Sequence, residues 1–171
     1  MVEFVPLENV AGDAVEALLD AAFGADRFGR TAYRLRSGTG MIAALSFGLV
    51  AENGALLGSI QCWPVQHRGK NGVATPMVMV GPVAVDPALQ RGGYGRRLMH
   101  GCLSAAEAQA DGALMMIGDP EYYGRFFGFS ADRTARWVLP GPVEPRRLLA
   151  RAANGHDAPD GAGHIGPRAN S

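Results

Sequence analysis

The sequence predicts a mixed α/β (α+β) domain, and three local patterns support this. Two apolar, β-type segments flank Asn53-Gly54, a pair that favours a tight hairpin turn. A later run, Met77 to Val85, is apolar on both faces, as a central strand should be. A glycine-rich loop and a helical pattern follow this strand directly. The chain has 171 residues, of which 47% are hydrophobic, so one domain with a proper core is expected.

The first half of the chain alternates between strand and helix signals. Phe4-Val5-Pro6 is interpreted as the end of a first strand. Apolar residues at helical spacing predict a helix over Ala14 to Phe23, and a second short helix is expected over Arg30 to Arg36. The two hairpin strands are predicted over Ala43 to Val50 and Leu56 to Gln66.

The second half contains one irregularity and four further elements. Gly81-Pro82 interrupts the apolar run, and because proline cannot donate to a strand ladder, we expect a bulge or splay there. Leu98 to Ala110 predicts a helix, and Ala113 to Ile117 predicts a buried strand. A last hairpin is expected over Phe129 to Leu139, and a short helix over Glu144 to Ala152.

The C-terminal segment differs in composition from the rest. From residue 153 on, Gly, Ala, Pro, Asn and His dominate, with almost no core-forming residues. We therefore expect one domain over residues 1–152 and a flexible tail over residues 153–171, which at most contacts a second copy. The protein is then a monomer or a homodimer. His156 and His164 in the tail are too few for a metal site, and no metal is expected.

The charge composition argues against two classes of partner. The 16 basic and 16 acidic residues balance, so no overall field attracts nucleic acid or a membrane surface. No apolar run reaches transmembrane length, and Met1 to Pro6 lacks the features of a signal peptide. Cys62 and Cys102 are too few for a disulfide framework and are interpreted as reduced core thiols. We expect a cytoplasmic protein.

The clearest candidate for a ligand-binding site is the glycine-rich loop after the central strand. Val83-Ala84-Val85-Asp86-Pro87 leads into Gln90-Arg91-Gly92-Gly93-Tyr94-Gly95-Arg96-Arg97-Leu98-Met99. A helix that begins here points unpaired backbone N–H groups and the positive end of its dipole at one spot. The glycines let the backbone approach a ligand, and the arginines suit phosphate oxygens. The pattern predicts a phosphate or pyrophosphate site; the alternative is an ordinary strand–helix turn that binds nothing.

Two common phosphate loops do not fit this spacing. A P-loop ends in Gly-Lys-Ser/Thr, and Lys70, the only lysine of the chain, lies far from the loop. A Rossmann fingerprint needs a glycine where Leu98 stands. The spacing that fits is Gln/Arg-x-x-Gly-x-Gly/Ala, filled by Gln90, Gly93 and Gly95.

This spacing resembles the acetyl-CoA pyrophosphate loop of the GCN5-related N-acetyltransferase (GNAT) superfamily. Downstream, Tyr122-Tyr123-Gly124-Arg125-Phe126-Phe127-Gly128-Phe129 resembles the Phe/Tyr-Tyr-x-x-x-Gly-Phe signature of that family, with one residue more between Tyr123 and Gly128. The segments Phe28 to Arg36 and Gly118 to Tyr123 are most similar to the YhbS-like bacterial branch. The resemblance covers roughly residues 3 to 150.

The resemblance implies a fold and a ligand. The fold is the GNAT acyl-CoA N-acyltransferase fold, a mixed, mostly antiparallel sheet of about six to seven strands with about four helices and splayed central strands. The implied cosubstrate is acetyl-CoA. Its expected contacts lie at the end of the central strand and in the glycine-rich loop: Val83, Ala84, Val85, Gln90, Arg91, Gly92, Gly93, Tyr94, Gly95 and Arg96.

The implied reaction is N-acetyl transfer to a primary amine by direct attack in a ternary complex. Tyrosine can protonate the departing thiolate at a cost of ~2 kcal/mol. Tyr123 is the expected acid and Tyr122 the second choice. Asp119 and Glu121 are candidate bases by position, and Asp119 is equally a candidate cap for a helix that begins at Pro120. His67 and Glu52 are further candidates, and a water relay would need none of these residues. Because the strand glutamate of many family members has no counterpart in Met77 to Gly81, the alternative is a non-catalytic acyl-CoA-binding regulatory or interaction protein.

The acceptor is less well defined. In this superfamily the first helices and the edge hairpins build the acceptor pocket. Here these segments carry aromatic residues that suit an apolar or aromatic amine, or that simply pack the core: Phe23, Phe28, Tyr33, Trp63 and Trp137.

Overall fold

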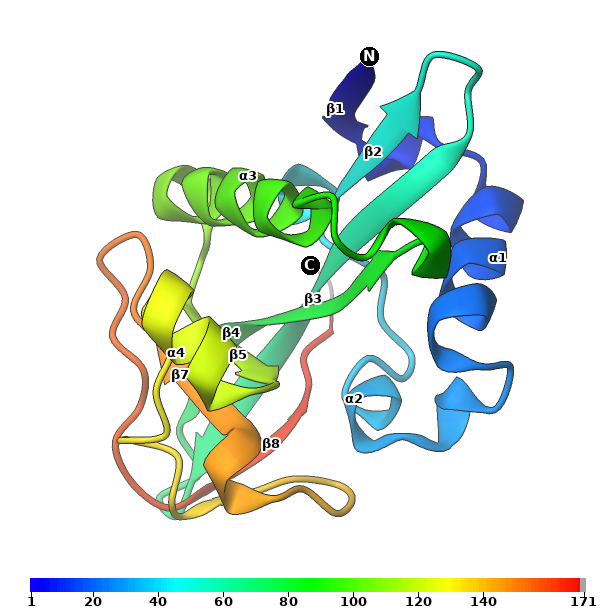
Figure 1. Cartoon of the computed structure of the whole chain (residues 1–171). Coiled ribbons are helices and arrows are strands. Elements are labelled where there is room, and N and C mark those ends of the chain that lie inside the picture. Colours follow the sequence, from blue (N-terminus) through cyan, green and yellow to red (C-terminus); the bar gives the residue numbers. More distant parts are fainter. Residues whose placement is uncertain (170–171) are drawn as a thin grey trace.

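A computed structural model describes residues 1–169, which form one twisted sheet with helices on both faces (Figure 1). The sheet runs in the order β1-β2-β3-β4-β5-β7, and β8 pairs with β3 and β6. Strand pairs are antiparallel except β4–β5 and β6–β8. The strands are β1 (Val2–Pro6), β2 (Phe47–Ala51), β3 (Leu56–Gly69), β4 (Ala74–Val85), β5 (Ala113–Ile117), β6 (Trp137–Val138), β7 (Leu148–Arg151) and β8 (Gly163–Pro167).

The helices cover both faces of the sheet, and each long helix buries the apolar side that its sequence spacing predicts. Helices α3 and α4 pack on one face, and α1 and α2 lie on the other (Figure 1). Helix α1 buries Leu18 and Leu19 at the spacing predicted from sequence, and α3 buries Leu98 and Cys102. Burial of each such large side chain contributes roughly 1.5–3 kcal/mol. The α-helices are α1 (Gly12–Phe23), α2 (Thr31–Arg34), α3 (Tyr94–Gln109) and α4 (Pro120–Phe127).

The sheet opens between its central strands. Parallel pairing of β4 with β5 extends only from Met77 to Met79 on the β4 side, although β4 continues to Val85. The register of β4 against β3 shifts opposite Gly81-Pro82, where the sequence predicts an irregularity. The structure therefore confirms the mixed, mostly antiparallel fold with splayed central strands.

Two elements predicted for the second half are wrong. The segment from Glu144 to Ala152 forms a short 3₁₀ turn (Pro145–Arg147) and then strand β7, not a helix. Leu149 packs on the α3 face while Leu148 and Ala150 pack on the opposite face, so this apolar run is a strand between two layers. In place of a hairpin over Phe129 to Leu139, the only strand there is β6, which pairs with β8.

The predicted flexible tail is also wrong for residues 153–169, which contain β8. This strand pairs with β3 through Val65–Gly69 and buries Ile165. The side chain of Arg168 donates to the carbonyls of Val65 and Met77 and to the Asp111 carboxylate. Main-chain pairing and the side chain of Arg168 thus hold this segment in place. Because these contacts need few apolar side chains, the composition of the segment wrongly predicts a flexible tail. Residues 170 and 171 of the predicted tail lie outside the described residues.

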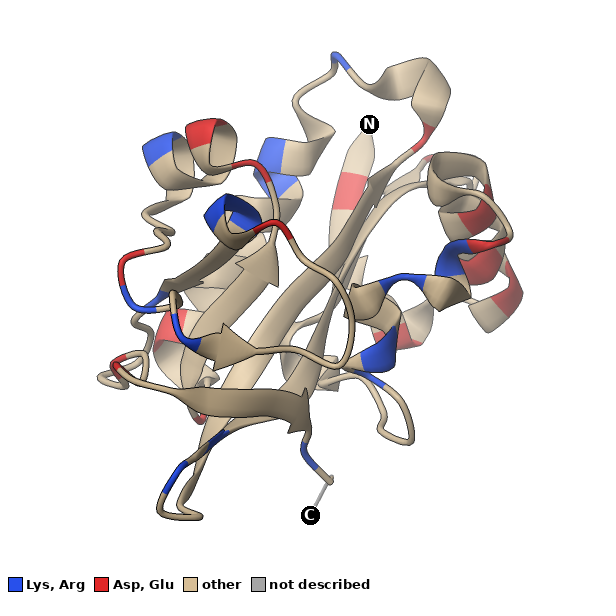
Figure 2. Ribbon diagram, turned by 90° about the horizontal axis from the view of Figure 1, so that it is seen from below, with Lys and Arg blue, Asp and Glu red and all other residues tan. Residues whose placement is uncertain are grey.

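Charged side chains of both signs are distributed over the fold (Figure 2). Among residues 1–169, no helix is long and apolar enough to cross a membrane. The same part of the chain contains no cluster of three or more His, Cys, Asp or Glu that could hold a metal ion. Cys62 and Cys102 are buried free thiols with their Sγ atoms 3.4 Å apart, as expected for core cysteines.

Candidate active site

The glycine-rich loop forms the start of α3. Gly93 precedes the helix with φ 77°, a left-handed conformation that favours glycine. The first intrahelical bond runs from the Arg97 N–H to the Gly93 carbonyl, over 3.1 Å. The N–H groups of Tyr94, Gly95 and Arg96 precede it, so they have no carbonyl one helical turn earlier to bind. These groups and the helix dipole are what an anion site requires.

A cavity of about 580 Å³, here called the loop cavity, lies in front of this helix end. Eight of the ten predicted acetyl-CoA contacts line it: Val83, Ala84, Val85, Gln90, Arg91, Gly93, Gly95 and Arg96. Gly92 and Tyr94 do not. A Cβ on Gly92 would lie 2.7 Å from the Tyr94 ring, and that ring packs against the core under α3. A Cβ on Gly95 would meet only Val85, at 3.9 Å, so it would project into open space.

Gln90 has a local bonding role that the motif does not reveal. Its Nε2 donates to the Val85 carbonyl over 3.0 Å, which fixes the loop against the end of β4. The next main-chain groups directed to the same edge belong to Val83, because alternate residues of a strand present their groups to the same side. Since β5 does not pair with β4 there, the Val83 groups face the open edge.

A second cavity, the β4–β5 cavity, opens where these strands separate and measures about 600 Å³. It and the loop cavity share Phe23, Val83 and Tyr123. The rest of its lining comes from α2, from β4 and β5, and from the segment before β7: Gly29, Arg30, Thr31, Ala32, Tyr33, Arg34, residues 79–82, residues 116–119, Pro142, Val143, Glu144 and Arg147.

Tyr123 lines both cavities, together with Phe23 and Val83, whereas Tyr122 lines the loop cavity and not the β4–β5 cavity. The two rings meet edge to face, with centroids 4.9 Å apart. Burial, and secondarily the neighbouring Tyr122 and Asp119, raise the pKa of Tyr123 above its ordinary value. The phenol therefore stays protonated at neutral pH and can act as a hydrogen-bond and proton donor.

Asp119 is the N-cap of α4. Its carboxylate accepts a hydrogen bond from the Glu121 N–H over 3.1 Å. Hydrogen bonding to Glu121, with the charges of Arg146 and Arg147 beside it, lowers the pKa of Asp119. A capping carboxylate with a lowered pKa is a poor proton acceptor. Glu121 itself is ion-paired with Arg146.

Glu144 and Arg147 also line the β4–β5 cavity, although no sequence motif indicates either of them. Both belong to the segment predicted as a helix, whose real course brings it beside β5. Of the predicted acceptor aromatics, Phe23 and Tyr33 line this cavity, while Trp63 and Trp137 are buried in the core. Phe28 is exposed and lies over the Arg27 guanidinium.

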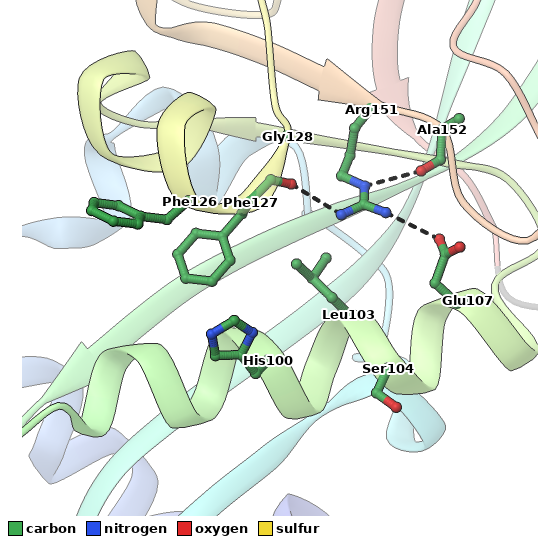
Figure 3. Close-up of a pocket in the computed structure, with 9 residues that line it drawn as sticks. All are labelled: His100, Leu103, Ser104, Glu107, Phe126, Phe127, Gly128, Arg151 and Ala152. Carbon is green, nitrogen blue, oxygen red and sulfur yellow. Dashed lines mark hydrogen bonds and ion pairs between the residues drawn. The ribbon is translucent and has the colours of Figure 1, made fainter.

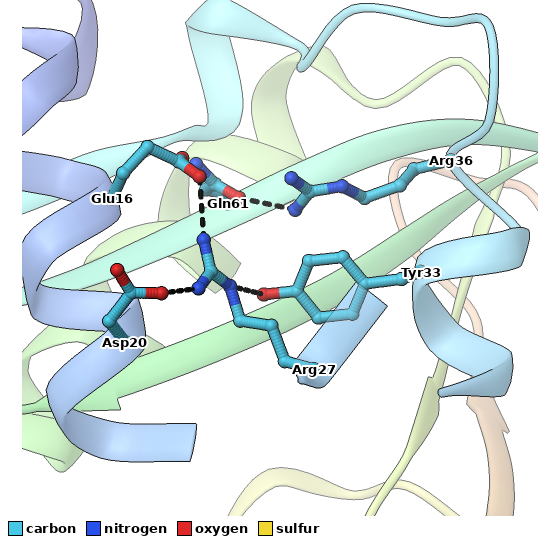
Figure 4. A network of polar contacts seen from close by, with 6 residues as sticks. All are labelled: Glu16, Asp20, Arg27, Tyr33, Arg36 and Gln61. Carbon is cyan, nitrogen blue, oxygen red and sulfur yellow. Dashed lines mark hydrogen bonds and ion pairs between the residues drawn. The ribbon is translucent and has the colours of Figure 1, made fainter. Parts of the chain in front are cut away.

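Tyr33 is held in the cavity wall by a polar network (Figure 4). The Arg27 guanidinium, only 1% exposed, donates through Nε to the Tyr33 hydroxyl over 3.0 Å and also binds Glu16 and Asp20 of α1. Arg36 lies over the ring of the same tyrosine, 4.3 Å from its centroid, and donates to Gln61. The network fixes α2, and with it one side of the cavity, to α1 and β3.

A further hollow of about 710 Å³ lies between α3 and the C-terminal end of α4 (Figure 3). Its single cation, Arg151, is already bound to the Phe127 and Ala152 carbonyls and to Glu107. The His100 ring packs edge to face on Phe127, 5.1 Å between centroids. With its charge satisfied internally, this hollow has no group poised for an anion.

Comparison with known proteins agrees with this geometry. The family model described as "Acetyltransferase (GNAT) family" matches residues 13–129. The chain is 29% identical, over 147 residues, to a protein of Escherichia coli strain K12 named "Uncharacterized N-acetyltransferase YhbS", covering 82% of this chain and 84% of that protein.

Two solved structures share the fold. The structure of YhbS from Escherichia coli in complex with CoA is similar with a TM-score of 0.70 at 20% identity, over 98% of this chain and 89% of that one. A GNAT family acetyltransferase from Brucella melitensis in complex with acetyl-CoA gives a TM-score of 0.66 at 24% identity, over 98% and 96%. Because the family model spans more than half of the chain, this protein belongs to the acetyltransferase (GNAT) family.

Proposed function

We propose that the protein is an acetyl-CoA-dependent N-acetyltransferase that acetylates a primary amine by direct attack in a ternary complex. The observation that carries the proposal is the meeting of two cavities at Tyr123. One cavity has an anion-binding helix start, and the other is a separate compartment for an acceptor. A protein that only binds acyl-CoA needs the first cavity and not the second.

The loop cavity fits the pyrophosphate and pantetheine of acetyl-CoA. The N–H groups at the start of α3 and the guanidinium groups of Arg91 and Arg96 supply donors and positive charge for phosphate oxygens. Val83, at the unpaired edge of β4, supplies main-chain groups for the amides of pantetheine. The solved relatives from Escherichia coli and Brucella melitensis hold CoA and acetyl-CoA, which supports this assignment.

Acetyl-CoA, when bound, supplies an acetyl thioester. Two proton transfers must accompany the reaction: the amine must lose a proton, and the departing thiolate must gain one. An alkylamine is mostly protonated at pH 7, and freeing it costs roughly 4–5 kcal/mol. Tyr123, which lines both cavities, protonates the thiolate as it leaves. Its raised pKa makes donation harder than for a free tyrosine, but keeps the proton in place until the thiolate forms.

Glu144 is the best-placed proton acceptor. It lines the β4–β5 cavity, and among the residues that the structure describes its carboxylate has neither a cap to hold nor an ion-pair partner. Asp119, by contrast, caps α4. Glu144 therefore accepts the amine proton directly or through water, in place of the strand carboxylate that is absent from Met77 to Gly81.

The test is release of CoA from acetyl-CoA in the presence of a panel of amines, detected with a thiol reagent. Both cysteines are buried, so the protein itself contributes little background. Tyr123→Phe should lower turnover by about 10²–10⁴-fold while acetyl-CoA affinity persists. Tyr122→Phe is the matched control and should retain turnover. Acetyl-CoA binding without turnover on any amine would favour the non-catalytic alternative.

A further inference from the structure

Glu144 and Arg147 lie at the two ends of one short turn, before and within the 3₁₀ helix Pro145–Arg147. The Arg147 N–H donates to the Glu144 carbonyl over 2.9 Å, and both residues line the β4–β5 cavity. In the described part of the chain, neither side chain has a hydrogen-bond or ion-pair partner, and they do not pair with each other. The turn thus presents one free carboxylate and one free guanidinium to the same cavity.

The other charges of this cavity are already engaged. Arg30 donates to the Phe23 carbonyl and Arg34 to the Pro140 carbonyl, each over 3.0 Å. Asp119 is used as the cap of α4. The lining of the cavity contains three arginines and two carboxylates. Of the three guanidinium groups, that of Arg147 has all five of its N–H donors available, arranged in a planar fork.

Arg147 also lies near the catalytic position. Its carbonyl accepts a hydrogen bond from the Gly118 N–H over 2.9 Å, and a Cβ on Gly118 would lie 2.8 Å from the Tyr123 ring, so Arg147 is one residue contact away from Tyr123 in the wall of the β4–β5 cavity. An anionic group bound by Arg147 would consequently lie close to the amine that reacts beside Tyr123. An α-amino acid carries its amine and its carboxylate on the same carbon, so it fits these two positions.

We propose that the acceptor is a free amino acid with an apolar side chain, whose carboxylate is bound by Arg147. The inference rests on the proposed function and adds the chemical class of the acceptor. Tyr33, Ile117 and Val143 give the same cavity an apolar wall for the side chain. A planar guanidinium binds a carboxylate through two parallel hydrogen bonds, which gives both affinity and orientation. Lysine side chains of proteins and simple alkylamines lack this carboxylate and should be poorer acceptors.

The test uses matched acceptors in the CoA-release assay. Several apolar amino acids, phenylalanine and leucine among them, are each compared with their carboxamide and with the decarboxylated amine. We expect kcat/KM to be about 10- to 100-fold higher for the free carboxylates, the range of charge-assisted hydrogen bonds. Arg147→Gln should abolish this preference, mainly by raising the acceptor KM, while the Kd of acetyl-CoA measured by calorimetry stays unchanged.

Arg146→Gln is the matched control. Arg146 is next in sequence but is ion-paired with Glu121 and does not line the cavity, so its loss should leave the preference intact. Equal or faster acetylation of the carboxamides by the wild type would overturn the inference while leaving the acetyltransferase proposal in place. A carboxylate preference that survives in Arg147→Gln would likewise overturn it. Absence of CoA release with every amine would overturn both.

Discussion

Replacing Arg27 by Met tests whether the polar network around Tyr33 holds α2 and the wall of the β4–β5 cavity in place. Methionine keeps the length and the apolar part of the side chain but removes the guanidinium. Lost with it are the bonds to Tyr33, Glu16 and Asp20, and the contact with the Phe28 ring 4.4 Å away.

The expected decrease in the free energy of unfolding depends on how well water can solvate each former partner of Arg27. Glu16 and Asp20 are 48% and 52% exposed, so they return to water and each bond accounts for about 1 kcal/mol or less. The Tyr33 hydroxyl is left buried without its donor, at a cost of ~1–2 kcal/mol. Loss of the cation–π contact adds ~0.5–1 kcal/mol. Because burying the guanidinium is itself unfavourable, part of this sum is offset, and we expect a net loss of about 2 kcal/mol.

Thermal and urea unfolding measure this change. For a domain of this length, ~2 kcal/mol corresponds to a fall of about 4–8 °C in Tm. The matched control is Arg125→Met, at an exposed position, which should change the free energy of unfolding by less than about 0.5 kcal/mol. If Arg27→Met lowers the free energy of unfolding by less than ~1 kcal/mol, or by no more than the control does, the network does not stabilise the position of α2.

Three further outcomes follow from the structure. Gly95→Val should fold normally, because its side chain enters open space, yet weaken acetyl-CoA binding at least about 10-fold in calorimetry; unchanged affinity would contradict the assignment of the loop cavity. Deleting residues 163–171 removes β8 and the buried Ile165, so the Tm should fall by roughly 6 °C or more, and an unaltered melting curve would show that β8 does not stabilise the fold. The raised pKa of Tyr123 means that the unfolded chain loses this proton first, so the free energy of unfolding is unaffected well below pH 10 and falls as pH rises through the folded pKa. Tyr123→Phe should flatten that alkaline decline in a pH series of unfolding curves, and an identical decline in both proteins would refute the assignment.

The parts of the protein that the sequence predicted are those encoded by local patterns. The helix start at Gly93 needs only adjacent glycines and a preceding strand, and the cap at Asp119 needs only the following proline, so both are visible in the sequence. Strand β8 was missed because its pairing with β3 uses main-chain groups, which leave no apolar pattern. Arg147 was missed because its position in the cavity depends on β7 pairing with β5, a contact between segments that the sequence does not reveal.

Because β4 separates from β5 beyond Met79, the two cavities are lined largely by different segments of the chain. The proposed acetyl-CoA side is built from the end of β4 and the start of α3, two elements whose buried side chains pack in the same core cluster. The proposed acceptor side depends on α2 and the turn before β7, which contribute side chains to the β4–β5 cavity and little to the strand ladder. Under the proposed function, substitutions in α2 and in the turn before β7 would change which amine is acetylated and leave the acetyl-CoA site intact, so proteins with this fold could acquire new acceptors and keep the same acetyl donor.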